Sequence, residues 1–129
     1  MAASYSTTLR NTRMDAITTA VGNAGVLNIY DGTRPAFGGA ATNLLASFTM
    51  GTPFAPASAA GVLSPTLPSN TTGLAAGTAT WARLQTSGGT AVIDMDVSTS
   101  GAQINLNTTT ISIGLTVSIT SASMTEGNP

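Results

Sequence analysis

The sequence has no cysteine, no histidine and no lysine, and only 7% of its 129 residues are charged. Ordinary soluble domains have about 25% charged residues. Without histidine and cysteine the chain cannot build a Ser-His-Asp triad, a thiol nucleophile, a zinc cluster or a disulfide framework. Without lysine it has neither a Schiff base nor a P-loop lysine. We therefore expect a protein that is not an enzyme and uses no cofactor.

The charges that are present give no sign of a nucleic-acid or membrane partner. Four arginines and five acids leave a net charge of −1, which is not the basic footprint of a nucleic-acid-binding protein. No apolar run reaches the roughly 18 residues that a membrane span needs, and the first residues lack the basic and apolar regions of a signal peptide. The absence of cysteine fits synthesis in a reducing cytoplasm.

Threonine, serine, alanine and glycine dominate the composition, and 42% of the residues are apolar. The length suits a single domain over residues 1–129. After an N-terminal arm at 1–7, helical spacing of apolar residues predicts a helix over 8–22, with Thr7 or Thr8 as its N-cap and Gly22 at its end. Arg10 and Asp15 should face solvent. The face predicted to lie on a sheet contains Leu9, Arg13, Met14, Ala16, Ile17, Ala20 and Val21.

The remaining chain, residues 26–125, is patterned for short strands separated by turns. Strands are expected at 26–30, 44–50, 78–86, 90–97, 103–107 and 111–120, with a further short segment at 62–67 that Pro65 interrupts. The clearest alternation, from Ile111 to Ile119, predicts a half-buried antiparallel strand, whereas the polar stretch 68–77 predicts an exposed loop. The predicted fold is mainly β: an antiparallel β-sandwich or jelly-roll-like barrel with one N-terminal α-helix and a short tail at 126–129.

Asp94 and Asp96 form the most chemically suggestive pair. As residues i and i+2 of a strand they point the same way, about 6.5 to 7 Å apart, a spacing that could serve a Ca²⁺ site or an inverting glycosidase. They are weak metal candidates, because both can equally lie on the solvent face opposite Ile93 and Met95. The Asp31-Gly32 turn with Arg34 offers a possible ligand loop, or a simple turn with a local ion pair.

Other residues are candidates for contact with protein partners. Trp81 and Arg83 share a strand face and can stack, either within the core or as an interface anchor. The N-terminal segment and the proline-containing loop 51–68 could each reach a neighbouring subunit. The expected interface residues are Tyr5, Leu9, Arg34, Phe54, Trp81 and Arg83.

The low charge of the strands favours assembly. Free β proteins commonly protect their edge strands with charged residues, lysine above all, and this chain has none to use. We therefore expect a homo-oligomer or a lattice in which neighbouring subunits cover the strand edges.

Several segments resemble the small structural proteins of tailed bacteriophages. Residues 4–17, SYSTTLRNTRMDAI, are similar to an "LRNxRLDAI" start, and residues 27–35, LNIYDGTRP, are similar to an "LxIYDGTxP" stretch. The likeness continues through GTATWARL at 77–84, GGTAV at 88–92 and MTEG at 124–127.

This resemblance implies a virion component and brings no catalytic residues with it. The leading hypothesis is a head decoration, or cement, protein that bridges major capsid subunits. We expect it to act as a homo-oligomer, with a trimer as the expected form. A tail, collar or fibre-associated protein is the alternative within the virion. A carbohydrate-binding module that uses Asp94 and Asp96 is the alternative from another class.

Overall fold

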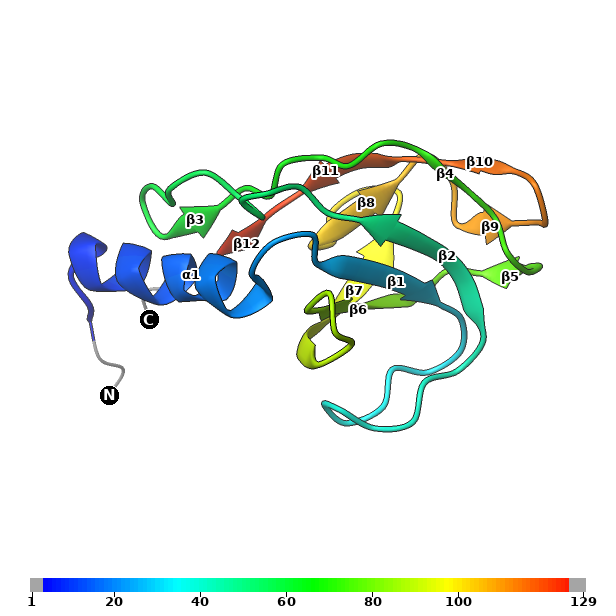
Figure 1. The fold of residues 1–129 in the computed structure, drawn as a ribbon, viewed down its shortest axis with the longest axis horizontal. Helices are drawn as coiled ribbons and strands as arrows, with labels where there is room; N and C mark the ends of the chain where they lie inside the picture. Colours follow the sequence, from blue (N-terminus) through cyan, green and yellow to red (C-terminus); the bar gives the residue numbers. More distant parts are fainter. Residues whose placement is uncertain (1–3, 126–129) are drawn as a thin grey trace.

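The computed structural model describes residues 4–125 and shows a mainly β protein with one helix (Figure 1). The predicted β-barrel-like architecture with an N-terminal helix is thus confirmed. The elements are α1 (Thr7–Val21), β1 (Val26–Tyr30), β2 (Leu44–Thr49), β3 (Val62–Leu63), β4 (Thr71–Thr72), β5 (Gly77–Thr78), β6 (Trp81–Gln85), β7 (Ala91–Ser98), β8 (Ile104–Leu106), β9 (Thr110–Ile111), β10 (Thr116–Val117), β11 (Ile119–Ala122) and β12 (Met124–Thr125).

The helix is capped one position before the predicted N-caps. The Ser6 hydroxyl accepts a hydrogen bond from the backbone N–H of Leu9 at 3.1 Å, so this side chain satisfies one of the unpaired N–H groups of the first turn. At the other end Gly22 has φ +71° and its N–H donates to the Thr18 carbonyl. The predicted stop at Gly22 is confirmed.

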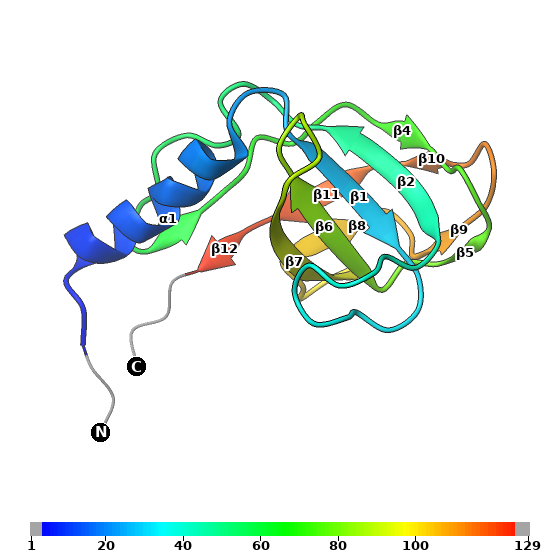
Figure 2. The same ribbon diagram turned by 60° about the horizontal axis from the view of Figure 1, so that its bottom comes forward.

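The predicted buried face of α1 is largely wrong. Met14 and Val21 are buried, whereas Leu9, Ala16 and Ala20 are exposed. The reason is that α1 projects from one end of the molecule beside β3 (Figure 2) and touches the main sheet chiefly at β7. Only a narrow line of the helix therefore meets apolar neighbours.

Polar side chains fix the helix to the segment before β3, and Arg10 and Asp15, which were predicted to face solvent, are half-buried there. Asp15 accepts a hydrogen bond from the Ser58 N–H at 2.8 Å, and Arg10 donates to the Ala60 carbonyl at 3.3 Å. Asn11 accepts from the Gly61 N–H at 2.8 Å. These side chains satisfy the backbone of a loop that has few backbone partners of its own.

The main sheet has six strands in the order β11-β8-β7-β6-β1-β2. Its pairs are antiparallel except β7 and β8, which run parallel with Val97 opposite Ile104. The sheet is therefore mixed, where the sequence predicted antiparallel pairing throughout. The Asn105 side chain stabilises the connection between these two parallel strands. Its oxygen accepts a hydrogen bond from the Ala102 N–H, and its nitrogen donates one to the Ala102 carbonyl.

The two edges of this sheet are joined through β4 and β10 (Figures 1 and 2). The N–H of Leu74, just after β4, donates to the Leu45 carbonyl of β2 at 2.8 Å. β4 pairs with β10, and β10 leads directly into β11. The segment predicted as an exposed loop at 68–77 thus closes a barrel. The β2 edge therefore gains a partner within the chain, and the expectation that neighbouring subunits cover strand edges stays a prediction.

The predicted continuous strand at 111–120 is wrong. β9 ends at Ile111, residues 112–115 form a turn, and β10 starts at Thr116. Gly114 has φ +82°, a conformation that glycine adopts without strain, and the Leu115 N–H donates to the Ser112 carbonyl at 3.1 Å. The alternation of apolar residues carries on through the turn, and it therefore mimics a strand.

The core fills the barrel and extends under the helix. The largest side chains with under 2% exposure include Trp81, Phe48, Phe54, Leu27, Ile29, Leu45, Leu63, Leu84, Ile104 and Leu106. Charges are distributed very unevenly around this core. Residues 35–82 and 97–125 contain none.

Candidate functional site

The described charges of the barrel gather beside the loop 33–41, around a buried ion pair between β6 and β7. Arg83 and Asp94 lie opposite each other in the pairing of these two strands. Nε of Arg83 is 2.8 Å from Oδ1 of Asp94, and a second guanidinium nitrogen donates to Oδ2 at 3.1 Å. The two side chains are only 8% and 5% exposed. This two-point geometry satisfies both charged groups where water is largely excluded.

Two stacked aromatic rings, one from β6 and one from β1, lie beside the arginine. The Trp81 ring stacks on Tyr30 with centroids 4.6 Å apart, and the Arg83 guanidinium carbon is 5.1 Å from the Trp81 centroid. The indole N–H donates to the Asp31 carbonyl at 3.0 Å. The predicted stacking of Trp81 and Arg83 is confirmed, and it takes place inside the subunit.

The same charges hold the loop 33–41 on the barrel. Arg83 donates to the Gly39 carbonyl at 2.8 Å, and the Gly38 N–H donates to the Asp94 carboxylate at 3.4 Å. Arg34 lies 3.3 Å from the Asp96 carboxylate and donates to the Asp94 carbonyl at 3.4 Å. The cluster therefore holds the loop through one ion pair and through hydrogen bonds between charged side chains and the loop backbone.

Asp94 and Asp96 thus have separate arginine partners, and they differ in exposure. The Asp96 side chain is 63% exposed, as predicted for a solvent-facing residue, but the prediction is wrong for buried Asp94. The hydrogen bond from Arg83 holds the pKa of Asp94 below its ordinary value, against the opposing effect of burial. A carboxylate held ionised in this way is poorly suited to act as a general acid. Residues 4–125 contain no group of three or more His, Cys, Asp or Glu that could hold a metal ion.

The Asp31-Gly32 turn is organised by Asn43, and Arg34 pairs elsewhere. The Asp31 carboxylate accepts from the Asn43 N–H at 3.0 Å and from its side-chain nitrogen at 3.2 Å. The backbone hydrogen bond is the main reason that the pKa of Asp31 is lowered. A local pair between Asp31 and Arg34 was the simpler sequence expectation, but the partner of Arg34 is Asp96.

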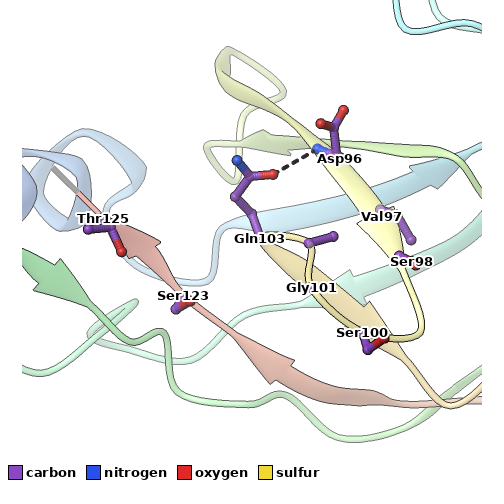
Figure 3. Close-up of a pocket in the computed structure, with 9 residues that line it drawn as sticks. Asp96, Val97, Ser98, Ser100, Gly101, Gln103, Ser123 and Thr125 are labelled. Carbon is purple, nitrogen blue, oxygen red and sulfur yellow. Dashed lines mark hydrogen bonds between the residues drawn. The ribbon is translucent and has the colours of Figure 1, made fainter. Parts of the chain in front are cut away.

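A polar pocket of about 430 Å³ opens between the end of β7 with the loop that follows it and the segment around β12 (Figure 3). The Asp96 N–H donates to the Gln103 side chain at its rim, at 3.2 Å. The lining contains no aromatic ring and is formed by Asp96, Val97, Ser98, Ser100, Gly101, Ala102, Gln103, Ser123 and Thr125. A carboxylate, an amide and several hydroxyls at one opening can exchange hydrogen bonds with a polyhydroxylated ligand.

The predicted interface residues divide into two groups. Phe54, Trp81 and Arg83 are 1%, 0% and 7% exposed, so they are interior groups of the folded subunit, and the expectation that they lie on a contact surface is wrong. Burial of Phe54 also anchors the loop 51–68, which is therefore not a free arm. Leu9 and Arg34 are exposed. The Arg13 guanidinium lies over the half-buried Tyr5 ring at 5.2 Å.

Sequence reasoning missed an exposed apolar surface beside β4 and β10, two strands that lie at the end of the barrel remote from α1 (Figures 1 and 2). We call it the apolar tip and define it as Leu74, Ile113 and Leu115, which are 53%, 78% and 36% exposed. Two backbone hydrogen bonds join its parts, from Gly73 N–H to the Leu115 carbonyl and from Gly114 N–H to the Gly73 carbonyl. Gly114 within the apparent strand was the signal that could have revealed the turn.

Comparisons with protein families, with curated proteins and with solved structures yield no match to this chain. The likeness to phage structural proteins therefore rests on the sequence segments themselves. Within residues 4–125 no helix has the length and apolar character required to cross a membrane.

Proposed function

We propose that the protein is a structural subunit of a bacteriophage particle, positioned on the outside of the head as a decoration protein that bridges major capsid subunits. The observation that carries this proposal is the apolar tip. Its large alkyl groups are exposed on two segments that backbone hydrogen bonds fix to each other, and exposed apolar groups are typical of a surface used for protein contacts. The segments that resemble phage proteins agree with this role.

The resemblance segments also contribute to the rigidity that such a subunit needs. Tyr30 and Asp31 come from the IYDGT segment, while Trp81 and Arg83 come from the WARL segment, and all four meet around the buried ion pair. A rigid subunit loses little conformational entropy when it binds. These residues therefore support a binding surface elsewhere on the molecule.

The mechanism is the burial of apolar area repeated over many symmetry-related copies. Each square ångström of apolar surface removed from water contributes about 25 cal/mol. A net gain of a few kcal/mol per copy, after the cost of association, is enough for a shell that carries many copies. The head would then resist the pressure of the packaged DNA.

The test compares phage particles that contain the wild-type protein with particles that lack it. Particles without the protein should release their DNA at a lower temperature and after a milder osmotic shock. Adding the purified protein back should restore resistance. Unchanged particle stability, or failure of the protein to bind the head, would reject a decoration role.

A tail, collar or fibre-associated position is the alternative within the virion. Labelling of intact particles separates the two positions, because a decoration protein covers the head in many copies and a tail component gathers at one vertex. Label confined to that vertex would replace the head assignment with the tail assignment.

A carbohydrate-binding role is favoured by one observation, the hydroxyl-rich pocket beside Asp96. If the pocket binds glycans, Asp96→Asn should reduce binding in a glycan array. Arg34→Gln is the matched control, since it removes the same ion pair but does not change the pocket lining. No glycan binding by the wild-type protein would eliminate this alternative.

A further inference from the structure

We propose that α1 is an exchangeable arm. In this helix exchange, α1 of one subunit leaves its own barrel and docks at the same place on a second copy of this chain, whose helix docks in return. The inference rests on the proposed function for its biological setting and deepens it, because it names the element that links neighbouring subunits. The helix lies at the end of the molecule opposite β4 and β10 (Figure 2), so the apolar tip remains available for the capsid.

Polar contacts join α1 to the turn 58–61 of its own subunit. The Asp15 carboxylate accepts from the Ser58 N–H at 2.8 Å, and the Ser58 hydroxyl donates to the Asn11 carbonyl at 2.9 Å. The Asn11 side chain accepts from the Gly61 N–H at 2.8 Å. The receiving surface thus matches α1 residue by residue, and every other copy of the chain carries the same surface.

The apolar part of the docking is small. Of the 15 residues of α1 only Met14 and Val21 are buried, and Ile17 is half-buried against the core. In β1, by contrast, three of the five residues are buried. Burial of apolar area is the main favourable term in folding, so α1 can leave the barrel at a smaller loss than a strand of the main sheet.

The backbone is strained on both sides of the docking. Ala24, in the link between α1 and β1, has φ +53°, and Ala60, in the receiving turn, has φ +52°. Among the described residues these two alone have a positive φ without being glycine. This region is unfavourable for a residue with a Cβ, and residues held in it are found preferentially at functional and switching elements.

The two strained positions respond differently to exchange. The receiving turn keeps its shape whichever copy supplies the helix, because Ala59 and Val62 pair across it. The strain at Ala24 belongs to a link that folds back on its own barrel, and an extended link releases it. Relief of strain at Ala24 therefore favours exchange, whereas Ala60 is neutral.

The link is also short. Residues 22–25 alone separate the helix from β1, and a Cβ at Gly25 would lie 2.3 Å from a side-chain carbon of Val21. The N–H of Ala24 is fixed by the Thr52 hydroxyl at 3.1 Å. A short link that is strained in the closed subunit is the condition under which identical chains exchange an element.

A second copy is the partner because only there are the broken contacts remade. The hydrogen bonds of α1 to the turn 58–61 are the same in both arrangements, so the balance lies between the strain relieved at Ala24 and the entropy lost on association. A different partner would leave the N–H groups of Ser58 and Gly61 without the acceptors that α1 provides. Copies bound side by side on a shell have a high local concentration, which favours exchange.

The first experiment asks whether copies of the purified protein exchange helices. Sedimentation equilibrium up to the solubility limit should show an oligomer that dissociates slowly on dilution, because each helix must leave its site before the chains separate. Isotope-filtered NMR on an equimolar mixture of labelled and unlabelled protein should show contacts between α1 of one copy and β3 of the other, which lie together within the closed subunit. Association without exchange would give the oligomer but no such contacts.

Ala24→Gly is the decisive variant, because glycine adopts a positive φ without strain. It should stabilise the closed subunit and weaken association by at least about 5-fold. Ala60→Gly is the matched control, since it relieves the same kind of strain in both arrangements and should leave association unchanged. Insertion of three glycines after Asn23 lets the link fold back freely and should give a monomer.

Three results would overturn the proposal: a wild-type protein that is monomeric at the highest concentration, an oligomer without contacts between α1 and β3 of different copies, or equal effects of Ala24→Gly and Ala60→Gly. A wild-type protein that exchanges helices but never binds phage heads would sustain this inference and reject the proposed function. A protein that decorates heads without exchanging helices would do the reverse.

Discussion

The charged side of the barrel and the apolar tip are rigid for different reasons. On the charged side Arg83 and Arg34 pair with Asp94 and Asp96 and hold the loop 33–41. At the tip there are no charges, and a glycine lets two backbone segments meet through hydrogen bonds.

This difference shows how a chain with very few charges uses them. Arg83, Asp94 and Asp31 have their charged groups engaged within the subunit, so they serve internal structure more than outward recognition. The tip leaves its alkyl groups in water, which is unfavourable unless another surface covers them. The charged side thus supports the structure of the subunit, whereas the tip is the surface that we propose for contacts.

The largest expected effect comes from removing one partner of the buried pair. Asp94→Ala should lower the free energy of unfolding by about 3 to 5 kcal/mol, because it leaves the Arg83 charge buried without a counter-ion. Asp96→Ala is the control on the same strand face and should cost less than about 1 kcal/mol, as its ion pair is exposed. Urea denaturation measures both. Equal losses would contradict the distinction between the two aspartates.

The tip has its own structural weak point at Gly73. Gly73→Ala should destabilise the protein by about 1 to 3 kcal/mol, since the added methyl would overlap the Ser112 carbonyl oxygen. Gly88→Ala, where the nearest atom to a new Cβ is 3.8 Å away, should be nearly neutral. Thermal denaturation compares the two variants. If both alanines are tolerated equally, the close approach at the tip is not a constraint.

The pH dependence of stability provides a third comparison. The pKa of Asp94 is lowered on folding, so its contribution is fully present above the ordinary value near 3.8 and is lost as the pH falls through the lower folded pKa. Asp31 changes in the same direction. The melting temperature should thus be steady from pH 7 to about pH 5 and fall below about pH 4. Asp94→Asn should melt lower at pH 7 and show a smaller further fall in acid than the wild-type protein.

The smallest expected effect is on the fold of tip variants. Ile113→Ser removes a side chain that is 78% exposed, so it should change the free energy of unfolding of the dilute subunit by less than about 0.5 kcal/mol. The measurement is urea denaturation at a concentration where the protein is monomeric. A large loss there would mean that Ile113 supports the fold, and the tip would then be part of the core.

Local patterns predicted the regular elements well. Residues 26–30, which are apolar except for Asn28 and end at the Asp31-Gly32 turn, form β1 at the expected bounds, and the Gly88-Gly89 turn joins β6 to β7 as predicted. The helix differed from its predicted range by one residue at each end. In these segments the local signal and the tertiary environment agree, which is why the prediction succeeded.

The failures occurred where a distant segment decides the outcome. The 111–120 pattern was broken by contact with Gly73, some forty positions earlier in the chain. The buried face of α1 was set by the loop 58–61, and Asp94 was drawn inward by Arg83 on the adjacent strand. The alternation of residues within a strand does not reveal which other strand it pairs with. Neither the ion-pair cluster nor the tip could therefore be predicted from the sequence alone.

The closure of the barrel through β4 and β10 carries a consequence for how the chain folds. The pairing joins Thr72 to Thr116, and such contacts between distant parts of a chain form slowly, because a long loop must be closed first. Until then β2 and β11 are open edges with no lysine to discourage pairing between chains. The newly made protein thus passes through an interval of high aggregation risk, and slow synthesis at low temperature should raise its soluble yield.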